Sequence, residues 1–154
     1  MQSRLELRIP PLLLLLITAG AMLGVTYAAP ALSVRVPGPT AVALALAALG
    51  VGSAVAGVVA FRHRHTTVNP LTPSASSAIV TGGIYRMSRN PMYLGFLLVL
   101  AGWVVWLSNA GAALVLPAFV AYLTRYQIEP EERALLAKFG SQYAEYMTRV
   151  RRWL

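Results

Sequence analysis

Side chains that can bind or react gather in two short segments of an otherwise apolar chain. The first holds Tyr85, Arg89 and the run Asn90-Pro91-Met92-Tyr93, and the second begins at Glu131. Tyrosine faces attract cations, a contact worth about 0.5–2 kcal/mol, and a carboxylate accepts hydrogen bonds from ammonium or hydroxyl groups. Arg86 or Arg89 can pair with a carboxylate, and Pro91 opens a helix whose free amides suit an anion. Both segments sit beside long apolar stretches, so the polar chemistry is concentrated at the edge of an apolar region, which suggests a site at a membrane face.

Two adjacent glutamates, Glu131 and Glu132, stand at the start of the second segment. We predict one helix over about 130–149. Glu131 lies at intervals of four residues from Leu135, Phe139 and Tyr143, so all four share the apolar side of this helix. This spacing predicts that Glu131 faces inward and that Glu132 points elsewhere. A carboxylate or thiol substrate needs no base near neutral pH, whereas an amine needs one, and Glu131 or Glu132 is then the nearby carboxylate candidate. We take Glu131 as the candidate catalytic residue, because its spacing places it on the inward side.

Long charge-free runs must position these segments. The chain is 57% hydrophobic and only 12% charged, with a formal net charge of +8, whereas about a quarter of the residues in a soluble domain are charged. Residues 9–30, 40–61 and 92–124 contain no Asp, Glu, Lys or Arg. Because a span needs roughly 20 apolar residues, we predict four transmembrane helices, over residues 9–29, 40–61, 92–107 and 112–126. The fold class expected is all-α: a polytopic membrane protein whose helix over 130–149 is amphipathic and cytoplasmic.

The basic residues predict the orientation of these helices. Arginine and lysine concentrate before the first span, in the 62–91 segment and after residue 124, whereas the 30–39 loop has only Arg35 and the 108–111 loop has none. The positive-inside tendency then places both termini and the 62–91 segment in the cytoplasm. We expect one membrane domain over 1–154, with two spans in 1–61 and a cofactor-binding core in 62–154.

Several other patterns have simpler interpretations. Tyr27-Ala28-Ala29 resembles a signal-peptide cleavage site, but the length of the first apolar run favours a retained span. Small residues between Gly50 and Gly57 favour close helix packing over a dinucleotide-binding loop, and they leave room for an oligomeric partner. His63 and His65 lack further ligands, and the chain has no cysteine, so no metal site is expected.

The two segments together resemble the isoprenylcysteine carboxyl methyltransferase-like family of integral membrane methyltransferases, and the related phospholipid methyltransferases. The resemblance runs from Gly83-Ile84-Tyr85 through Asn90-Pro91-Met92-Tyr93 to Glu131-Glu132, and covers about residues 66–154. It implies an S-adenosylmethionine cofactor at the cytoplasmic ends of the last helices, capped by the helix over 130–149. It also implies a lipophilic acceptor that arrives from the bilayer.

The resemblance assigns residues to the cofactor and the substrate. Asn90-Pro91-Met92-Tyr93 corresponds to the family's cofactor-binding His-Pro-x-Tyr, Tyr85 to an upstream tyrosine, and Glu131 to the first glutamate of its pair. A small-residue stretch of the family corresponds to Ser77-Ala78-Ile79-Val80, so Ile79 and Val80 are expected to bind the cofactor. Gln127 stands where the family has a substrate-contacting arginine, which leaves the acceptor open among a carboxylate, an amine and a thiol.

The function predicted is therefore methyl transfer from S-adenosylmethionine to a lipophilic small molecule or lipidated substrate at the cytoplasmic membrane face, with an isoprenylcysteine-type carboxylate as one candidate. Membrane lipids are expected partners, and nucleic acid is not. Two alternatives stay open: a non-catalytic membrane interaction protein, and a membrane reductase that uses a nicotinamide cofactor.

Overall fold

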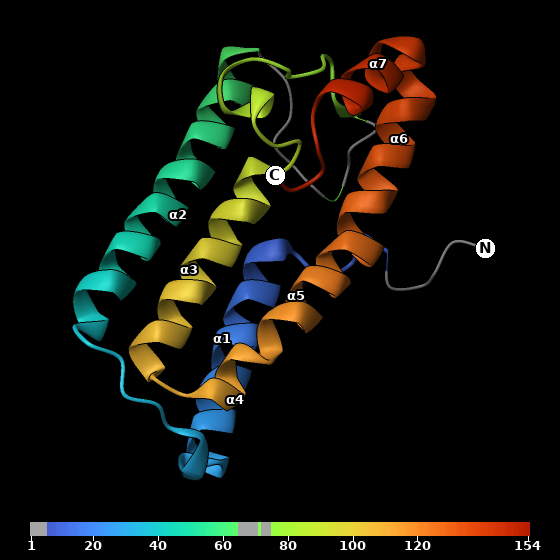
Figure 1. Cartoon of the computed structure of the whole chain (residues 1–154). Coiled ribbons are helices and arrows are strands. Elements are labelled where there is room, and N and C mark those ends of the chain that lie inside the picture. Colours follow the sequence, from blue (N-terminus) through green and yellow to red (C-terminus); the bar gives the residue numbers. More distant parts are fainter. Residues whose placement is uncertain (1–5, 65–70, 72–74) are drawn as a thin grey trace.

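Helices make up all the regular secondary structure of the residues that the computed structural model describes, which are 6–64, 71 and 75–154 (Figure 1). The all-α prediction is confirmed for them. In chain order the elements are α1 (Pro11–Ala28), η1 (Pro30–Leu32), α2 (Pro39–His63), η3 (Gly83–Arg86), α3 (Pro91–Leu107), α4 (Ala110–Ala113), α5 (Val115–Leu123), η4 (Thr124–Ile128), α6 (Glu129–Phe139) and α7 (Ser141–Arg149).

Proline begins most of the long helices. Pro11, Pro39 and Pro91 each occupy one of the first two positions of their helix, where the missing N–H would have no helical partner anyway. The α3 helix ends at Ser108, whose φ of 51° is left-handed. These local signals explain why the bounds predicted for the first three apolar helices lie within two residues of those observed.

Within the described part of the chain, two helices are long and apolar enough to cross a membrane, namely α1 and α2. A core helix of a soluble protein would pass the same test, but only 22% of α1 and 17% of the best α2 window is buried. Their exposed side chains include Leu16 at 62%, Leu44 at 66% and Leu49 at 64%. Exposed apolar surface of this extent indicates contact with lipid or another apolar partner.

The α2 and α3 helices cross closely because glycines meet at their interface. A Cβ on Gly50 would stand 2.5 Å from the Gly95 carbonyl oxygen, and one on Gly57 would stand 2.6 Å from Met92 Cγ. The Ser53 hydroxyl donates to the Pro91 carbonyl across the same interface at 2.7 Å. Gly50, Ser53 and Gly57 are therefore used inside this chain, as expected for close helix packing.

Gly50→Ala is expected to destabilise the protein by about 1–3 kcal/mol, the usual cost of overpacking, because the neighbouring backbone oxygen cannot move aside easily. Gly52→Ala is the matched control, since a Cβ there meets nothing within 4 Å. Thermal unfolding of both variants in detergent checks this. Equal midpoints for the two variants would contradict the close crossing.

The fourth predicted span differs from the helix observed. It is divided into α4 and α5 at Leu114, and the Asn109 side chain caps α4 by accepting from the Ala112 amide at 3.1 Å. The run then continues through η4, a π-helical turn, directly into α6. The predicted helix over 130–149 is also wrong as one element: Gly140, with a φ of 53°, separates α6 from α7.

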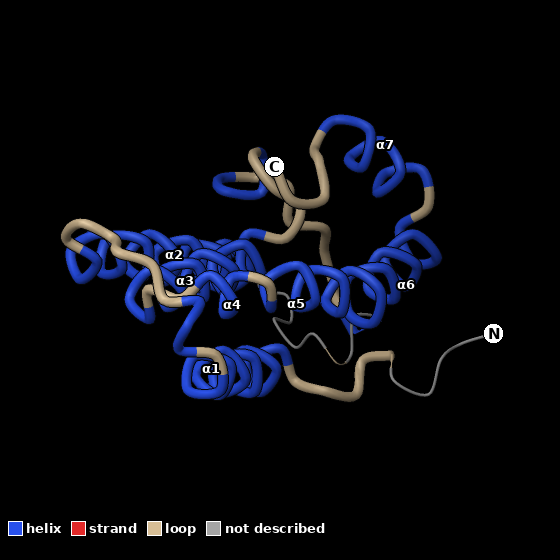
Figure 2. The backbone as a smooth tube through the Cα atoms, turned by 60° about the horizontal axis from the view of Figure 1, so that its bottom comes forward, coloured by secondary structure: helices blue, strands red, loops and turns tan. Residues whose placement is uncertain are grey.

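These elements form a V whose open end carries the polar residues. The α3 helix and the α5–α6 run diverge from the turn that joins them, and the last residues of the chain enter the space between them (Figure 1). Figure 2 shows α1 as a separate layer beneath α2, α3 and α5, with α7 on the opposite side. Where the layers meet, the core is formed by large buried side chains, which include Met22, Leu100, Phe119, Leu123 and Ile128.

Candidate functional site

Three predicted site residues meet at the open end of the V. The Tyr93 hydroxyl donates to Glu131 Oε1 at 2.5 Å, and Gln127 Nε2 donates to the same oxygen at 2.8 Å. Tyr93 belongs to α3, Gln127 to the π-turn and Glu131 to α6. Gln127 and Glu131 share a face because they lie four residues apart in one helical run. Glu131 therefore faces inward, as its spacing predicted.

Burial controls the ionisation of Glu131. It raises the pKa of this carboxyl from 4.5 to about 7, against the opposing effect of the hydrogen bonds from Tyr93 and Gln127, and the nearby Glu132 raises it slightly further. A carboxyl in such an environment changes its charge near neutral pH, which is the range useful for acid–base work.

Tyr85 lies beside this group. It is buried, its ring meets Phe61 edge to face with centroids 5.4 Å apart, and its carbonyl accepts from the Tyr146 hydroxyl at 2.7 Å. Burial raises the Tyr85 pKa far above its usual value, with smaller contributions from Tyr146 and Glu131. Tyr85 is therefore within electrostatic reach of the Glu131 carboxylate.

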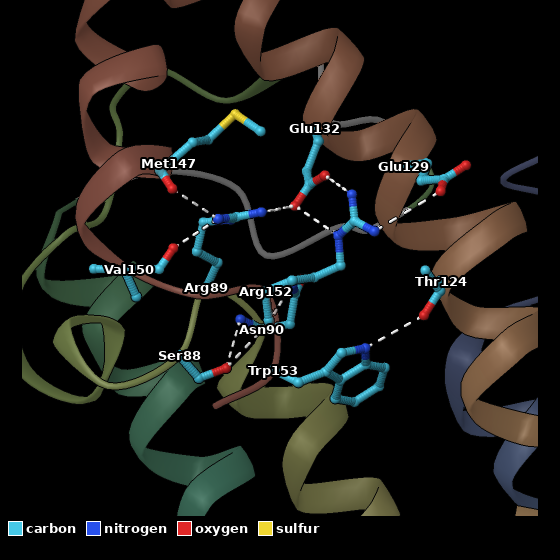
Figure 3. A network of polar contacts seen from close by, with 10 residues as sticks. All are labelled: Ser88, Arg89, Asn90, Thr124, Glu129, Glu132, Met147, Val150, Arg152 and Trp153. Carbon is cyan, nitrogen blue, oxygen red and sulfur yellow. Dashed lines mark hydrogen bonds and ion pairs between the residues drawn. The ribbon is translucent and has the colours of Figure 1, made fainter. Parts of the chain in front are cut away.

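A second cluster is built on Glu132 (Figure 3). Its carboxylate accepts from Arg89 Nη2 at 2.6 Å and from Arg152 Nη2 at 2.7 Å, and the Arg89 and Glu132 side chains are each only 8% exposed. The two arginines hold the Glu132 pKa below its usual value despite the opposing effect of burial. Glu132 thus points elsewhere than Glu131, as predicted, but it is buried against these two arginines.

Arg89 and Asn90 are bonded to the end of α7 and to the residues after it. Arg89 Nη1 donates to the Val150 carbonyl at 2.6 Å and to the Met147 carbonyl at 3.1 Å. Asn90 Nδ2 donates to the Arg152 carbonyl at 2.9 Å. Both residues were expected to contact a cofactor, and in the structure their side chains bond to this part of the chain.

The other predicted residues lie around the two clusters. Pro91 and Val80 are buried and Ile79 is half-buried. Met92 and Phe96 line an apolar hollow of about 360 Å³ between α2 and α3, with Arg62 at its border. His63 is exposed at the end of α2, and His65 lies outside the described residues.

Sequence reasoning missed the partners of the π-turn. Glu6 accepts from Arg133 at 2.6 Å and lies 3.7 Å from Arg125, and the Leu7 amide donates to the Tyr126 carbonyl at 3.0 Å. These contacts tie the residues before α1 to the segment that carries Gln127. The only available signal was that Glu6 is the one acidic residue outside the last quarter of the chain.

The fold and the site together define a helical protein with long apolar helices and a tyrosine–carboxylate cluster at one end. The chain belongs to the phospholipid methyltransferase family, whose model matches residues 39–142. The resemblance inferred from the two polar segments is thus confirmed, and the family is one of membrane methyltransferases.

Individual relatives agree with this membership. An uncharacterized protein of Haemophilus influenzae is 44% identical over 63 residues, which are 41% of this chain and all of that protein. Protein-S-isoprenylcysteine O-methyltransferase B of Arabidopsis thaliana is 39% identical over 72 residues, or 47% of this chain and 36% of the relative. Methanethiol S-methyltransferase 2 of Bradyrhizobium diazoefficiens is 40% identical over 67 residues, or 44% and 25% respectively. The chain therefore spans about a third or less of these two named enzymes, and no solved structure is a significant match.

Proposed function

We propose that this protein transfers a methyl group from S-adenosylmethionine to a lipophilic acceptor at the cytoplasmic face of a membrane. The observation that carries the proposal is the position of Glu131 among the glutamates. Each of the other four glutamates of the chain is ion-paired with arginine. Among the five glutamates, all of which the structure describes, Glu131 alone has no cationic partner, although its carboxylate is enclosed by Tyr93 and Gln127.

An enclosed carboxylate without a cation suits a positively charged ligand, since buried charges are normally paired. The faces of Tyr85 and Tyr93 add to this preference through cation–π attraction. S-adenosylmethionine carries both a sulfonium and an ammonium group, so these residues fit it. When bound, it supplies an electrophilic methyl group.

In this proposal the chain binds and orients the reactants. Glu131 pairs with the positive charge of the cofactor, the Tyr93 hydroxyl and the Gln127 amide hold that carboxylate in place, and Tyr85 closes the side towards α2. Placement of this kind can contribute roughly 7–11 kcal/mol to a bimolecular step. When the acceptor is an amine, Glu131 is the candidate base that accepts its proton.

The surroundings support a lipophilic acceptor. The hollow between α2 and α3 is lined mainly by valine, methionine and phenylalanine side chains and lies next to Met92, one residue before Tyr93. The topology proposed is four spans with both termini cytoplasmic. In this topology α1 and α2 are the two longer spans, and α3 and the α4–α5 run are the two shorter ones. Gln127 would then contact the acceptor from the π-turn.

Calorimetric titration of the purified protein in detergent tests the methyl donor. We expect S-adenosylmethionine and S-adenosylhomocysteine to bind and NADPH not to bind. The reverse pattern would favour a nicotinamide-dependent reductase, and no binding of any of the three would favour a non-catalytic membrane protein. A labelled-methyl assay with membrane lipid extract, prenylcysteine analogues and small thiols then distinguishes the acceptors.

A further inference from the structure

The 150–153 segment connects the two arms of the V. On the α3 side, the Arg89 amide donates to the Arg151 carbonyl at 3.0 Å and Asn90 Nδ2 donates to the Arg152 carbonyl at 2.9 Å. On the other side, Arg152 Nη2 binds Glu132 of α6 at 2.7 Å and Trp153 Nε1 donates to Thr124 Oγ1 of the π-turn at 3.3 Å. Figure 3 shows the contacts of Asn90 and Glu132 with Arg152 and that of Thr124 with Trp153.

Each of these anchors lies close in sequence to a residue of the candidate site. Asn90 precedes Tyr93 by three residues, Thr124 precedes Gln127 by three, and Glu132 follows Glu131 directly. Because each pair belongs to one helical turn or its cap, a shift of the anchor moves the site residue with it. The distance between the arms of the V therefore decides whether Tyr93 and Glu131 can meet.

Helix-to-helix packing between the arms lies near their joined end, while at the open end Arg89 also binds Glu132 directly at 2.6 Å. The α3 helix packs on α4 and α5, whereas α6 points away from α3 (Figures 1 and 2). Trp153 also packs against the core cluster that contains Leu123 and Ile128. At the open end, the 150–153 segment thus adds polar and apolar contacts to the direct bond between Tyr93 and Glu131.

We propose that Arg152 and Trp153 are positioning residues, which hold α3 and α6 at the separation that the Tyr93–Glu131–Gln127 site requires. They act through Glu132 and Thr124 and need not touch the cofactor. The effect on S-adenosylmethionine rests on the proposed function, whereas the effect on the arms of the V does not. Misplacement of site residues by about 1 Å can cost up to about a hundredfold in function.

The test compares Arg152→Gln and Trp153→Phe with Arg151→Gln. Arg151→Gln removes the same charge from the same segment, but the Arg151 side chain is exposed and only its backbone carbonyl is used. We expect Arg152→Gln and Trp153→Phe to bind S-adenosylmethionine about ten- to hundredfold more weakly than wild type, and Arg151→Gln to bind it as wild type does. Arg152→Lys should recover part of the loss, because it restores the charge without the forked geometry.

Amide hydrogen exchange without ligand supplies the second readout. Exchange at residues 89–93 and 127–132 should be faster in Arg152→Gln and Trp153→Phe, with residues 39–63 unchanged. If these variants lower only the thermal midpoint and bind S-adenosylmethionine as wild type does, the positioning role is refuted. If wild type itself does not bind S-adenosylmethionine, the proposed function fails, and unchanged exchange at the two segments would separately refute the role of the 150–153 segment.

Discussion

Glu131→Gln is expected to weaken S-adenosylmethionine binding about ten- to hundredfold at pH 8. The variant keeps a hydrogen-bonding side chain of the same size, so the loss reports the missing charge. Hydrogen bonds to charged groups contribute about 1.5–3 kcal/mol, and 1.4 kcal/mol corresponds to a tenfold change in affinity. Calorimetric titration at pH 6, 7 and 8 measures the effect.

The pH dependence of binding follows from the pKa of Glu131, which is about 7. The groups that face it are Tyr93 and Tyr85, the Gln127 amide and the neighbouring Glu132. A bound cation favours the carboxylate, so binding releases a proton whenever Glu131 is protonated beforehand. Affinity should therefore rise with pH up to about 7 and then level off, and this rise should be absent in Glu131→Gln.

The same pKa predicts the opposite effect on stability. A carboxyl whose pKa is raised from 4.5 to about 7 by folding favours the folded state when it is protonated. That contribution is complete below 4.5 and is lost as the pH rises through 7. Unliganded Glu131→Gln should therefore be more stable than wild type at pH 8, by at most about 3 kcal/mol, since one pKa unit corresponds to about 1.4 kcal/mol.

Glu145→Gln is the control for both effects, because Glu145 is 70% exposed and pairs only with Arg149 on the surface. It should bind S-adenosylmethionine as wild type does at every pH. Equal weakening in Glu131→Gln and Glu145→Gln would show that the loss is one of general charge and would remove Glu131 from the site.

The sequence predicted the inward position of Glu131 because its immediate neighbours follow ordinary helical geometry. It could not predict the position of Glu132, since that depends on residues far along the chain. The break at Gly140 separates α7 from α6, and the 150–153 segment then passes beside Glu132. Consequently α6 has two inward sides, one towards Tyr93 and one towards Arg152. The π-turn at 124–128 also left no recognisable pattern in the sequence.

The contacts that Arg89 makes within the chain could not be predicted for a similar reason. Its position directly before Asn90-Pro91 suggested that it pairs with the carboxylate of a cofactor, because the neighbouring sequence contains no Asp or Glu with which it could pair. In the structure its guanidinium donates to Glu132 and to two carbonyls, that of Met147 in the last turn of α7 and that of Val150 just after it. A ligand carboxylate would have to compete with these bonds.

Arg89→Gln is accordingly expected to destabilise the protein by about 3–5 kcal/mol, the usual result of removing one partner from a buried ion pair. Glu132 would be left enclosed with only Arg152 beside it, and two carbonyls would lose their donor. Denaturant unfolding in detergent measures the change. Arg86→Gln is the control, since Arg86 is exposed in the preceding η3 turn, and it should alter stability by less than about 0.5 kcal/mol.

The double variant Arg89→Gln with Glu132→Gln separates the structural role of Arg89 from a role in ligand binding. Because it removes the uncompensated charge together with its partner, it should be more stable than Arg89→Gln alone, so the two changes are not additive. If Arg89 instead mainly served a ligand carboxylate, Arg89→Gln would weaken S-adenosylmethionine binding while the free energy of unfolding stayed near that of wild type. The contacts of Arg89 with Glu132, Met147 and Val150 predict the first outcome, in which stability falls and the second substitution restores part of it.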